Sequence, residues 1–538
     1  MAGANVGPAG PSPVKNGAWI TFASILTMML TAGTIYGFGE WSRALKRQDG
    51  YNLDQFQVET LALASHLGNY MVLDSGYIVS HFGTSTGFAL GSSYASIGYF
   101  GMWMALALFP GQLPFWLLFV FCVLYGHGCG TIDTAAMSEL MADFPQYKGY
   151  TVGCTKAYYG LATATVATIY RAAFPSKEEN FLLFLAIYSA LAGLILVPTV
   201  HATKGLVDQP KDKVTFKFNA TAVTILLFAV MFFVVQLNAK AIDQSGWWIV
   251  LAVVVLGALS PFLLSYGALG DADADNTEVH KVQDTVHSPA DMSFFQTVTS
   301  MNFYLLFVSL VACQGGGLLM IGNALQILDS FSGEDLDQTS FVSTMSIFNS
   351  LGRLLIGLGS EKYAAHLNRP WFLVISASIL CVSYTLLVTA GSAVLWPAAA
   401  GVSFGYGSLW GVQAPLAQEL FGPSDFAMKY TSICLAALAG SFIFSTMLAG
   451  KMFDEESERL GTVNGLGQPT CLQTSCFNTS FLVTAACTGL AVALSVWLSM
   501  RTARIYAKVQ AIGSEAQILD SCEGSEDSEE SSSDDRAC

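Results

Sequence analysis

Apolar stretches long enough to cross a membrane recur along the chain, separated by short polar segments. A helix needs roughly 20 mostly apolar residues to cross the hydrocarbon core of a bilayer. The second stretch also contains His66, Asn69 and Asp74, so we expect its helix to face protein or a cavity rather than lipid. The pattern predicts an all-α polytopic membrane protein with about 14 spans, at residues 18–39, 57–80, 86–109, 113–141, 149–171, 179–201, 219–239, 246–268, 301–327, 340–359, 371–391, 394–420, 428–450 and 479–500.

The composition of the chain supports this interpretation. Of the 538 residues, 53% are hydrophobic and 12% are charged, whereas an ordinary soluble protein has about 25% charged residues. The mean hydropathy is +0.50. A chain of this length has too little polar surface to cover a water-soluble globule, and it is too apolar to stay disordered.

The net charge of −15 is concentrated outside the apolar stretches. Acidic residues gather between Asp271 and Asp284, and again between Glu515 and Asp535. The second of these segments is rich in Ser, Asp and Glu and has no apolar period, so we expect a disordered, solvated tail. The few charges that remain within the apolar stretches are therefore the places to look for function.

Positive charges predict the orientation in the membrane. An even number of spans puts both termini on one side, and Lys and Arg favour cytosolic loops. With both termini in the cytosol, the inside loops hold more of these residues than the outside loops, and the cluster of Arg43, Lys46 and Arg47 is the main exception. We expect the plasma membrane as the location, because the sequence contains no retention or transit signal that we recognise.

Two cysteines lie in the long polar loop before the last predicted span. This topology places Cys471 and Cys476 outside the cell, where a disulfide can form, although two free thiols in a polar loop are the alternative. The neighbouring Asn478-Thr479-Ser480 run matches the glycosylation acceptor pattern, so Asn478 is a candidate glycosylation site.

The first and last thirds of the chain share landmarks. The separation between Gly76 and Gly357 is nearly the same as that between Glu139 and Glu419. We therefore expect two six-helix repeats with an inserted helix pair, a layout that places the substrate site of many secondary transporters between the halves. The predicted segments are a flexible cytosolic N-terminal tail (1–17), an N-terminal six-helix bundle (18–201), a cytosolic linker with the inserted pair (202–268), an acidic cytosolic linker (269–300), a C-terminal six-helix bundle (301–500) and an acidic disordered cytosolic tail (501–538).

Glycines are repeated in the fourth and twelfth predicted spans. Small residues let helices approach closely, slide or bend. Static close packing explains any single glycine, but their repetition in equivalent helices of both halves favours a rocking interface. The residues are Gly126, Gly128 and Gly130 in one span and Gly401, Gly405, Gly407 and Gly411 in the other.

Three stretches resemble a known family. The first runs from Asp143-Phe144-Pro145 through Lys148-Gly149 to Lys156 and Gly160. The second joins Asn323, Gln326 and Ile327 to Phe341-Val342-Ser343, Asn349, Gly352-Arg353 and Ser360-Glu361. The third contains Gly405, Gly407, Trp410, Glu419-Leu420-Phe421-Gly422, Gly450 to Asp454 and the Cys471 and Cys476 pair. Together they resemble the nodulin-like transporters of the major facilitator superfamily, which are related to oxalate/formate exchangers and monocarboxylate carriers.

This resemblance covers most of residues 18–500 and implies the major facilitator fold, two six-helix bundles with an inserted central helix pair. It also implies that Arg353 binds substrate, because an arginine in the equivalent helix does so in the related carriers. One departure concerns the loop between the second and third helices. Ser80 and His81 stand there at the family's acidic and basic positions, whereas the second half keeps Glu361 and Lys362. Gating charge is therefore expected mainly in the second half.

Ionisable residues within the spans are costly and are candidates for function. A guanidinium at Arg353 can hold a carboxylate with two hydrogen bonds, although it could instead reach an ion pair at the cytosolic gate. Lys156 is a second candidate anion contact, unless Asp133 or Glu139 neutralises it.

Asp74 and Asp133 are candidate proton-coupling residues, because burial lets a carboxylate load and release a proton as the cavity alternates. A structural hydrogen bond is the alternative for each. We assign gating to Glu139, Glu361, Lys362 and Glu419 near the cytosolic ends. Further side chains expected around the central cavity are Tyr36, Asn69, Tyr158, Gln314, Asn323, Gln326, Asn349, Trp410 and Gln413.

The sequence thus predicts a secondary active transporter that works by alternating access on a small organic anion such as a monocarboxylate, with a proton as a possible co-substrate. One alternative cargo is a metal cation such as iron, for which Asp74, Asp133, His66 and His127 would matter. Another alternative is a receptor or sensor on a transporter fold. We expect no enzyme activity, no cofactor, no resident metal and no nucleic-acid partner. The small-molecule substrate and the lipid bilayer are the expected partners, and the transport unit is expected to be monomeric.

Overall fold

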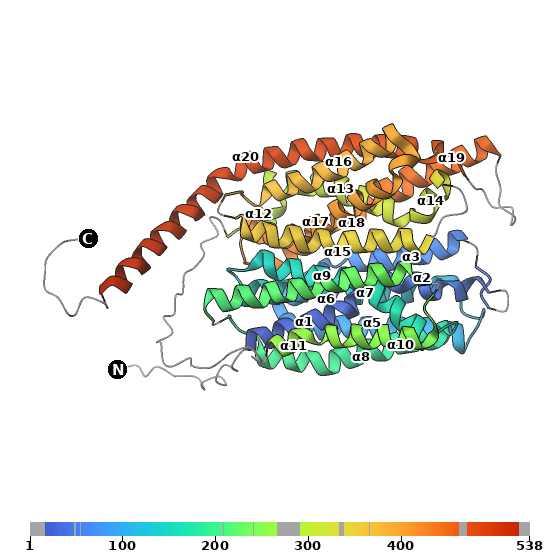
Figure 1. Cartoon of the computed structure of the whole chain (residues 1–538), viewed down its shortest axis with the longest axis horizontal. Helices are drawn as coiled ribbons and strands as arrows, with labels where there is room; N and C mark the ends of the chain where they lie inside the picture. The colour runs from blue at the N-terminus through green and yellow to red at the C-terminus, as the bar shows by residue number, and fades with distance from the viewer. Residues whose placement is uncertain are drawn as a thin grey trace.

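The computed structural model describes residues 17–526 except 48, 49, 54, 208, 240, 266–290, 333–337, 365 and 462–470. Nearly all of the predicted N-terminal tail and most of the predicted acidic linker lie outside these residues. Throughout the described part the chain is helical, and the long helices run side by side along the longest axis (Figure 1). We name the end at which α1 begins and α20 leaves the bundle the proximal end, and the opposite end the distal end.

The first half holds the helices that correspond to the first six predicted spans. They are α1 (Gly17–Ala32), η1 (Gly33–Gly37), α2 (Phe38–Trp41), η2 (Ser42–Lys46), α3 (Gln55–Tyr70), α4 (Leu73–Phe82), α5 (Thr84–Ala107), α6 (Phe115–Asp143), α7 (Lys148–Ala173) and α8 (Glu178–Thr203).

The inserted pair follows as α9 (Lys211–Leu237), α10 (Gln244–Ala258) and α11 (Ser260–Ser265). The second half comprises α12 (Phe294–Val298), α13 (Met301–Gly322), α14 (Ala324–Ser332), α15 (Gln338–Lys362), α16 (Pro370–Ala390), η3 (Gly391–Val394), α17 (Leu395–Phe421), α18 (Phe426–Gly440), the π-helical η4 (Ser441–Gly450), α19 (Lys451–Leu460) and α20 (Ser475–Glu526).

Ten helical segments within the described residues are long and apolar enough to cross a membrane. One of them, Pro370–Phe421, contains two of the predicted spans. Helices α5 and α7 lie where spans are predicted but are too polar to meet that standard, and α7 is buried along most of its length. A helix that faces protein does not need an apolar surface all round, so the count of 14 spans stays a prediction.

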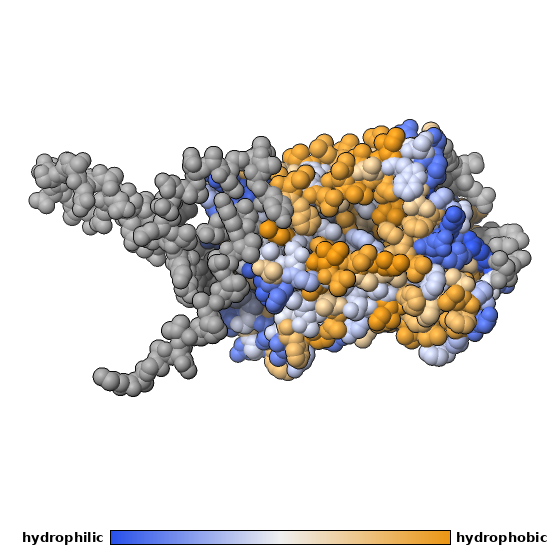
Figure 2. Space-filling view, turned by 90° about the horizontal axis from the view of Figure 1, so that it is seen from below, coloured by the Kyte–Doolittle hydropathy of each residue, from blue (hydrophilic) through white to orange (hydrophobic). Residues whose placement is uncertain are grey.

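An apolar surface covers the middle of one face of the molecule. Figure 2 shows apolar residues over the middle of one face, with hydrophilic residues toward its ends. Helices α9 and α10 contribute exposed side chains such as Leu227, Val230, Ile249 and Leu256. An apolar surface of this extent on a long helical bundle is what a lipid bilayer solvates, so the chain is a multi-pass integral membrane protein.

The second predicted span is interrupted. Helix α3 ends at Tyr70, and α4 begins at Leu73 after a non-helical Val72 (φ −117°, ψ 29°). The interruption lies against α6, where a Cβ atom on Gly130 would come within 2.3 Å of the Asn69 carbonyl oxygen. Residues on both sides of the break therefore reach the centre of the molecule.

The repeated glycines make their closest approaches within each half, so a rocking interface at these helices stays a prediction. Gly126 and Gly130 of α6 pack on α3 within the first half. Gly407 and Gly411 of α17 pack on α15 within the second half. These glycines bring helices of one bundle together, and a side chain there would meet backbone atoms of the same bundle.

The close approach between the halves is made by other glycines. A Cβ atom on Gly357 of α15 would lie 2.5 Å from the Gly153 Cα atom and 3.0 Å from the Gly149 carbonyl oxygen of α7. Likewise, a Cβ atom on Gly76 of α4 would lie 2.9 Å from the Ala427 carbonyl oxygen of α18. Both seams lie toward the proximal end, where the two bundles touch backbone to backbone.

The C-terminal segment differs from its prediction. Helix α20 continues from the bundle to Glu526, so residues 501–526 are helical rather than a disordered tail. A helix already nucleated within a bundle extends at little cost, because each added residue contributes one further hydrogen bond. Residues 527–538 lie outside the described residues.

At the distal end the structure brings the two loop cysteines together. The Cα atoms of Cys471 and Cys476 are 6.2 Å apart and their sulfur atoms meet, a separation that a disulfide spans. Asn478 is exposed in the first turn of α20, two residues further along.

Candidate substrate site between the two halves

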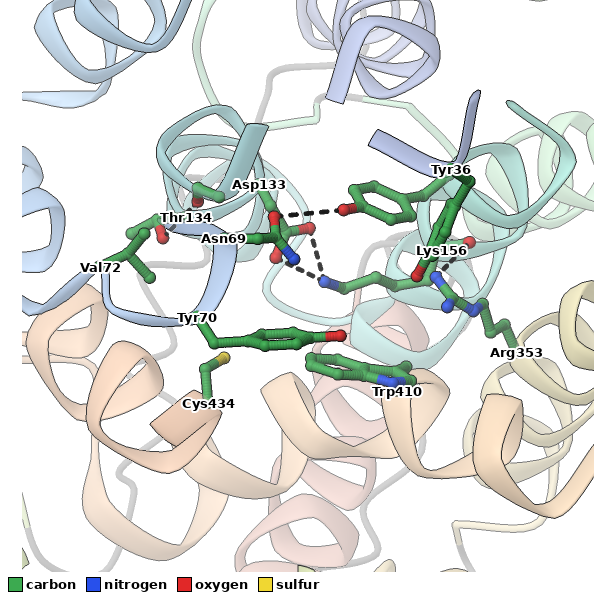
Figure 3. Close-up of a pocket in the computed structure, with 12 residues that line it drawn as sticks. Tyr36, Asn69, Tyr70, Val72, Asp133, Thr134, Lys156, Arg353, Trp410 and Cys434 are labelled. Carbon is green, nitrogen blue, oxygen red and sulfur yellow. Dashed lines mark hydrogen bonds and ion pairs between the residues drawn. The ribbon is translucent and has the colours of Figure 1, made fainter. Parts of the chain in front are cut away.

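A small cavity lies between the two bundles near the middle of the helices (Figure 3). The centre of a water molecule can move through about 20 Å³ of it, which is room for one water. The lining comes from η1, α3, α6 and α7 of the first half and α15, α17 and α18 of the second half. The lining residues are Tyr36, Asn69, Tyr70, Val72, Gly130, Asp133, Thr134, Lys156, Tyr159, Arg353, Trp410 and Cys434.

The first half contributes an ion pair that is already complete. The Lys156 ammonium group of α7 lies 2.5 Å and 2.7 Å from the two carboxylate oxygens of Asp133 on α6 (Figure 3). Both residues are buried, with 2% and 9% of their surface exposed. Of the two acidic partners that the sequence allowed for Lys156, the structure therefore selects Asp133. Removing the charge from either residue would leave the other buried without a counter-charge.

Aromatic rings and a hydroxyl group surround this lysine. Its ammonium group lies 5.1 Å from the Trp410 ring centroid and 5.9 Å from that of Tyr159. It also donates a hydrogen bond of 2.7 Å to the Tyr430 hydroxyl group of α18. Cation–π attraction and this extra acceptor stabilise the charge where water is scarce.

The second half contributes a buried cation with neutral partners. Arg353 of α15 is 2% exposed, donates from Nε to the Asn349 side-chain oxygen at 3.0 Å, and donates to the Lys156 carbonyl oxygen at 3.3 Å. Its guanidinium group lies 5.4 Å from the Tyr159 ring centroid. Among the described residues, no aspartate or glutamate forms an ion pair with Arg353. The alternative in which Arg353 reaches the proximal gate does not fit, because Glu361 is bound by Arg369 instead.

The remaining predicted substrate contacts divide into two groups. Tyr36 and Trp410 line the cavity, and Asn349 orients Arg353. The other three residues are turned elsewhere, which corrects their predicted place around the cavity. Gln413 accepts a hydrogen bond from Gln314 at 2.8 Å, Asn323 donates to Ser445 at 3.0 Å, and the exposed contact of Gln326 is with Glu59 at 3.2 Å.

The two proton-coupling candidates also lie in different surroundings. Asp133 lines the cavity, whereas the Asp74 carboxylate is 59% exposed and pairs with His127 of α6 at 3.0 Å. His66, a candidate for the alternative metal cargo, is half-buried and stacks on the Tyr70 ring with centroids 6.2 Å apart. Within the described residues, no three His, Cys, Asp or Glu side chains converge as a metal site would require.

The predicted gating residues lie at the proximal end. Glu361 accepts a hydrogen bond from the Gly149 backbone at 2.5 Å, so this carboxylate of the second half holds the first half directly. Arg369 donates to Glu361 at 3.1 Å and to Glu419 at 2.9 Å. Glu139, the counterpart of Glu419 in the first half, accepts from the Thr84 hydroxyl group. Lys362 is exposed beside the Tyr363 ring.

Arg369 is the centre of this proximal network, although the sequence pattern did not single it out. It is 4% exposed and also donates to the Ser360 hydroxyl group at 2.7 Å. Burial opposes its charge, but the Glu419 and Glu361 carboxylates outweigh burial and hold the pKa of the guanidinium above its ordinary value. Arg369 therefore remains charged and ties α15 to α17.

Several cavity residues were missed by the sequence analysis. Tyr159 lines the cavity, whereas the predicted Tyr158 lies toward Ser260 of the inserted pair. The helical period contained the missing signal, because a residue three positions after Lys156 shares its face of the helix. The other missed lining residues are Tyr70, Val72, Gly130, Thr134 and Cys434. Val72 and Tyr70 reach the cavity through the break between α3 and α4, which apolar periodicity does not reveal.

Comparisons with known proteins agree with this architecture. The family model described as Nodulin-like matches residues 18–266, and the model described as NFD4, C-terminal domain, matches residues 292–508. The protein NUCLEAR FUSION DEFECTIVE 4 of Arabidopsis thaliana is 21% identical, over 91% of this chain and 90% of its own length. The probable transporter MCH1 of Yarrowia lipolytica is 29% identical, over 38% of this chain and 43% of its own length.

The fold is also that of a solved transporter. The structure of the proton:xylose symporter XylE superimposes with a TM-score of 0.54 at 11% sequence identity, covering 88% of this chain and 94% of XylE. At this identity the likeness concerns the fold alone. The two family models divide the chain at the linker between the inserted pair and the second half, as the two-bundle architecture requires. The first part of the chain thus matches the Nodulin-like family model, the second part matches the NFD4 C-terminal domain model, and the whole has the fold of a major facilitator superfamily transporter.

Proposed function

We propose that this secondary transporter carries a small organic anion of the monocarboxylate type by alternating access, and that Arg353 binds the carboxylate. The observation that carries the proposal is a buried guanidinium group at the edge of the central cavity with neutral partners only. A buried charge without a counter-charge is unfavourable, and an anionic substrate would supply the missing charge.

The neighbouring groups favour a small anion over other cargo. The guanidinium offers two parallel donors, which match the two oxygens of a carboxylate. The rings of Tyr36, Tyr70 and Trp410 supply apolar walls for a short carbon chain. A metal cation fits less well, because it would meet the positive charges of Arg353 and Lys156, and Asp133 is already neutralised.

Proton coupling is assigned to Asp133 in this proposal. Its carboxylate lines the cavity and is held by Lys156, whereas the exposed Asp74 carboxylate pairs with His127. If Lys156 turns toward a bound anion, Asp133 loses its counter-charge, and a proton from the cavity would restore neutrality. Anion and proton would then cross together.

The orientation and the modifications are proposed together. With the proximal end in the cytosol, Cys471 and Cys476 form a disulfide outside the membrane and Asn478 is available to glycosylation there. We propose the plasma membrane as the location. Labelling a C-terminal tag on intact cells tests this orientation, and a tag that reacts from outside contradicts it.

Uptake into proteoliposomes tests the function. Labelled short-chain monocarboxylates, oxalate and divalent metal ions are offered to the wild type, to Arg353→Ala and to Arg459→Ala. Arg459 is a matched control, because it is an arginine with a 69% exposed side chain that pairs with Glu456 at the distal end. We expect carboxylate uptake that Arg353→Ala abolishes and Arg459→Ala preserves. Metal uptake that survives Arg353→Ala, with no carboxylate uptake by the wild type, would contradict the proposal.

An imposed pH gradient tests the coupling separately. An acidic outside solution should drive carboxylate uptake by the wild type, and Asp133→Asn should remove this response. Uptake that is indifferent to the gradient would leave an anion carrier without proton coupling.

A further inference from the structure

Tyr430 joins the second half of the molecule to the ion pair of the first half. It lies on α18 and is fully buried at 0% exposure. Its hydroxyl group accepts a hydrogen bond from the Lys156 ammonium group at 2.7 Å and donates one to the Asp133 carboxylate at 3.0 Å. The hydroxyl group thus satisfies both charges at once, across the boundary between the bundles.

The surroundings of Tyr430 hold it in this position. One turn before it along α18, the backbone of Ala427 packs against Gly76 of α4 with no room for a side chain. The Phe426 ring stacks on the Tyr430 ring with centroids 5.8 Å apart. The backbone packing at Ala427 and the Phe426 ring together fix the Tyr430 ring. Its hydroxyl group can therefore leave the ion pair only if α18 moves relative to α6 and α7.

The number of hydrogen bonds that Lys156 can donate indicates what would break its contact with Tyr430. An ammonium group has three donors, and here two bind Asp133 while the third binds the Tyr430 hydroxyl group. An anion held by Arg353 would lie in the cavity that Lys156 also lines. A carboxylate that recruits Lys156 would displace the neutral hydroxyl group before the charged Asp133, since the hydroxyl is the weaker acceptor.

We propose that Tyr430 is a positioning residue that latches the two bundles while the cavity is empty and releases them when an anion takes its hydrogen bond from Lys156. This role rests on the proposed function in one respect only, the identity of the displacing anion. The latch itself follows from the hydrogen bonds between α18 and the α6 and α7 pair. It couples occupation of the site to separation of the halves through one hydroxyl group.

The reactivity of Cys434 tests the latch without a substrate. Cys434 lines the cavity one turn after Tyr430 and is 4% exposed, so a small maleimide reaches it only when the halves separate. The purified protein in lipid nanodiscs is labelled, and the rate of modification is read at Cys434 by peptide mass spectrometry. Tyr430→Phe removes the hydroxyl group and keeps the ring. We expect labelling about tenfold faster, the effect of losing roughly one hydrogen bond to a charged group.

Tyr384→Phe is the matched control. Tyr384 is also fully buried, but its hydroxyl group donates to the Gly316 carbonyl oxygen within the second half. Its substitution should leave the labelling of Cys434 unchanged. Equal acceleration by both substitutions, or none by Tyr430→Phe, would overturn the latch.

A double substitution removes the remaining ambiguity. In Lys156→Met/Asp133→Asn the hydroxyl group has lost its charged partners, so adding Tyr430→Phe should no longer accelerate labelling. An undiminished tenfold effect in that background would show a role in packing alone and contradict the proposal. Because no substrate is used, accelerated labelling without carboxylate transport supports the latch and rejects the proposed cargo, whereas transport with unchanged labelling does the reverse.

Discussion

Two buried cations face one small cavity, and they differ in what balances them. Lys156 of the first half is neutralised by Asp133 and also donates a hydrogen bond to the Tyr430 hydroxyl group. Arg353 of the second half has an amide, a backbone carbonyl group and an aromatic face as partners. The difference indicates a division of labour, in which the second half holds the anion and the first half responds to it.

The largest expected effect concerns the buried ion pair between Lys156 and Asp133. Lys156→Met leaves the Asp133 carboxylate buried without a counter-charge, and breaking a buried pair in this way costs about 3–5 kcal/mol. Arg353→Met strands no carboxylate, so it should destabilise the protein less. Thermal unfolding in detergent measures both. Equal losses of stability, or no rescue of Lys156→Met by adding Asp133→Asn, would remove the contrast between the two cations.

The second expected effect concerns Arg353, the buried cation whose partners are neutral. Arg353→Lys keeps the charge but loses the planar fork of donors, so the affinity for a carboxylate should fall tenfold to about a hundredfold, or about 1.4–2.8 kcal/mol. Lys156→Arg gives the comparison from the other half. Competition for labelled substrate measures the affinity. An Arg353→Lys variant with unchanged affinity would place the anion elsewhere.

The third expected effect concerns the close contact between the two halves at Gly357 of α15 and Gly153 of α7. Gly357→Val places a side chain 2.5 Å from the Gly153 Cα atom, and overpacking of this kind costs about 1–3 kcal/mol. We expect it to separate the proximal ends and to slow transport. Gly359→Val is the control, because its Cβ atom would meet only the Phe372 ring at 3.6 Å. Similar transport rates for both variants would show that the seam tolerates separation.

The smallest expected difference is that between the two repeated glutamates. Glu419 accepts hydrogen bonds from Arg369 and from Tyr506 of α20, whereas Glu139 accepts from the Thr84 hydroxyl group. Glu419→Gln weakens an ion pair and should cost about 1.5–3 kcal/mol, and Glu139→Gln about 0.5–1.5 kcal/mol. Thermal unfolding of the two variants measures the difference. A larger loss for Glu139→Gln would mean that the first half carries the stronger proximal network.

Much of the architecture could be predicted from the sequence. The apolar stretches located the helices, because a bilayer imposes the same length and polarity on every span. The repeated landmarks separated the two halves and the inserted pair. The scarcity of charge within the apolar stretches also identified Arg353, Lys156 and Asp133 as functional candidates, since ionisable groups within membrane spans are costly and rare. These conclusions depend on composition and period, which are properties of the chain itself.

The tertiary structure decided which of these groups meet. Gln413 and Asn323 looked like cavity residues but bond Gln314 and Ser445, because helix rotation within a bundle sets the direction of each side chain. Tyr430 gave no signal at all, since its role arises from hydrogen bonds to two residues that lie 274 and 297 positions away in the sequence. Only the packing of the two bundles could show that Lys156 is balanced and that Arg353 is open to a substrate, because a counter-charge is defined by distance in space rather than by position in the sequence.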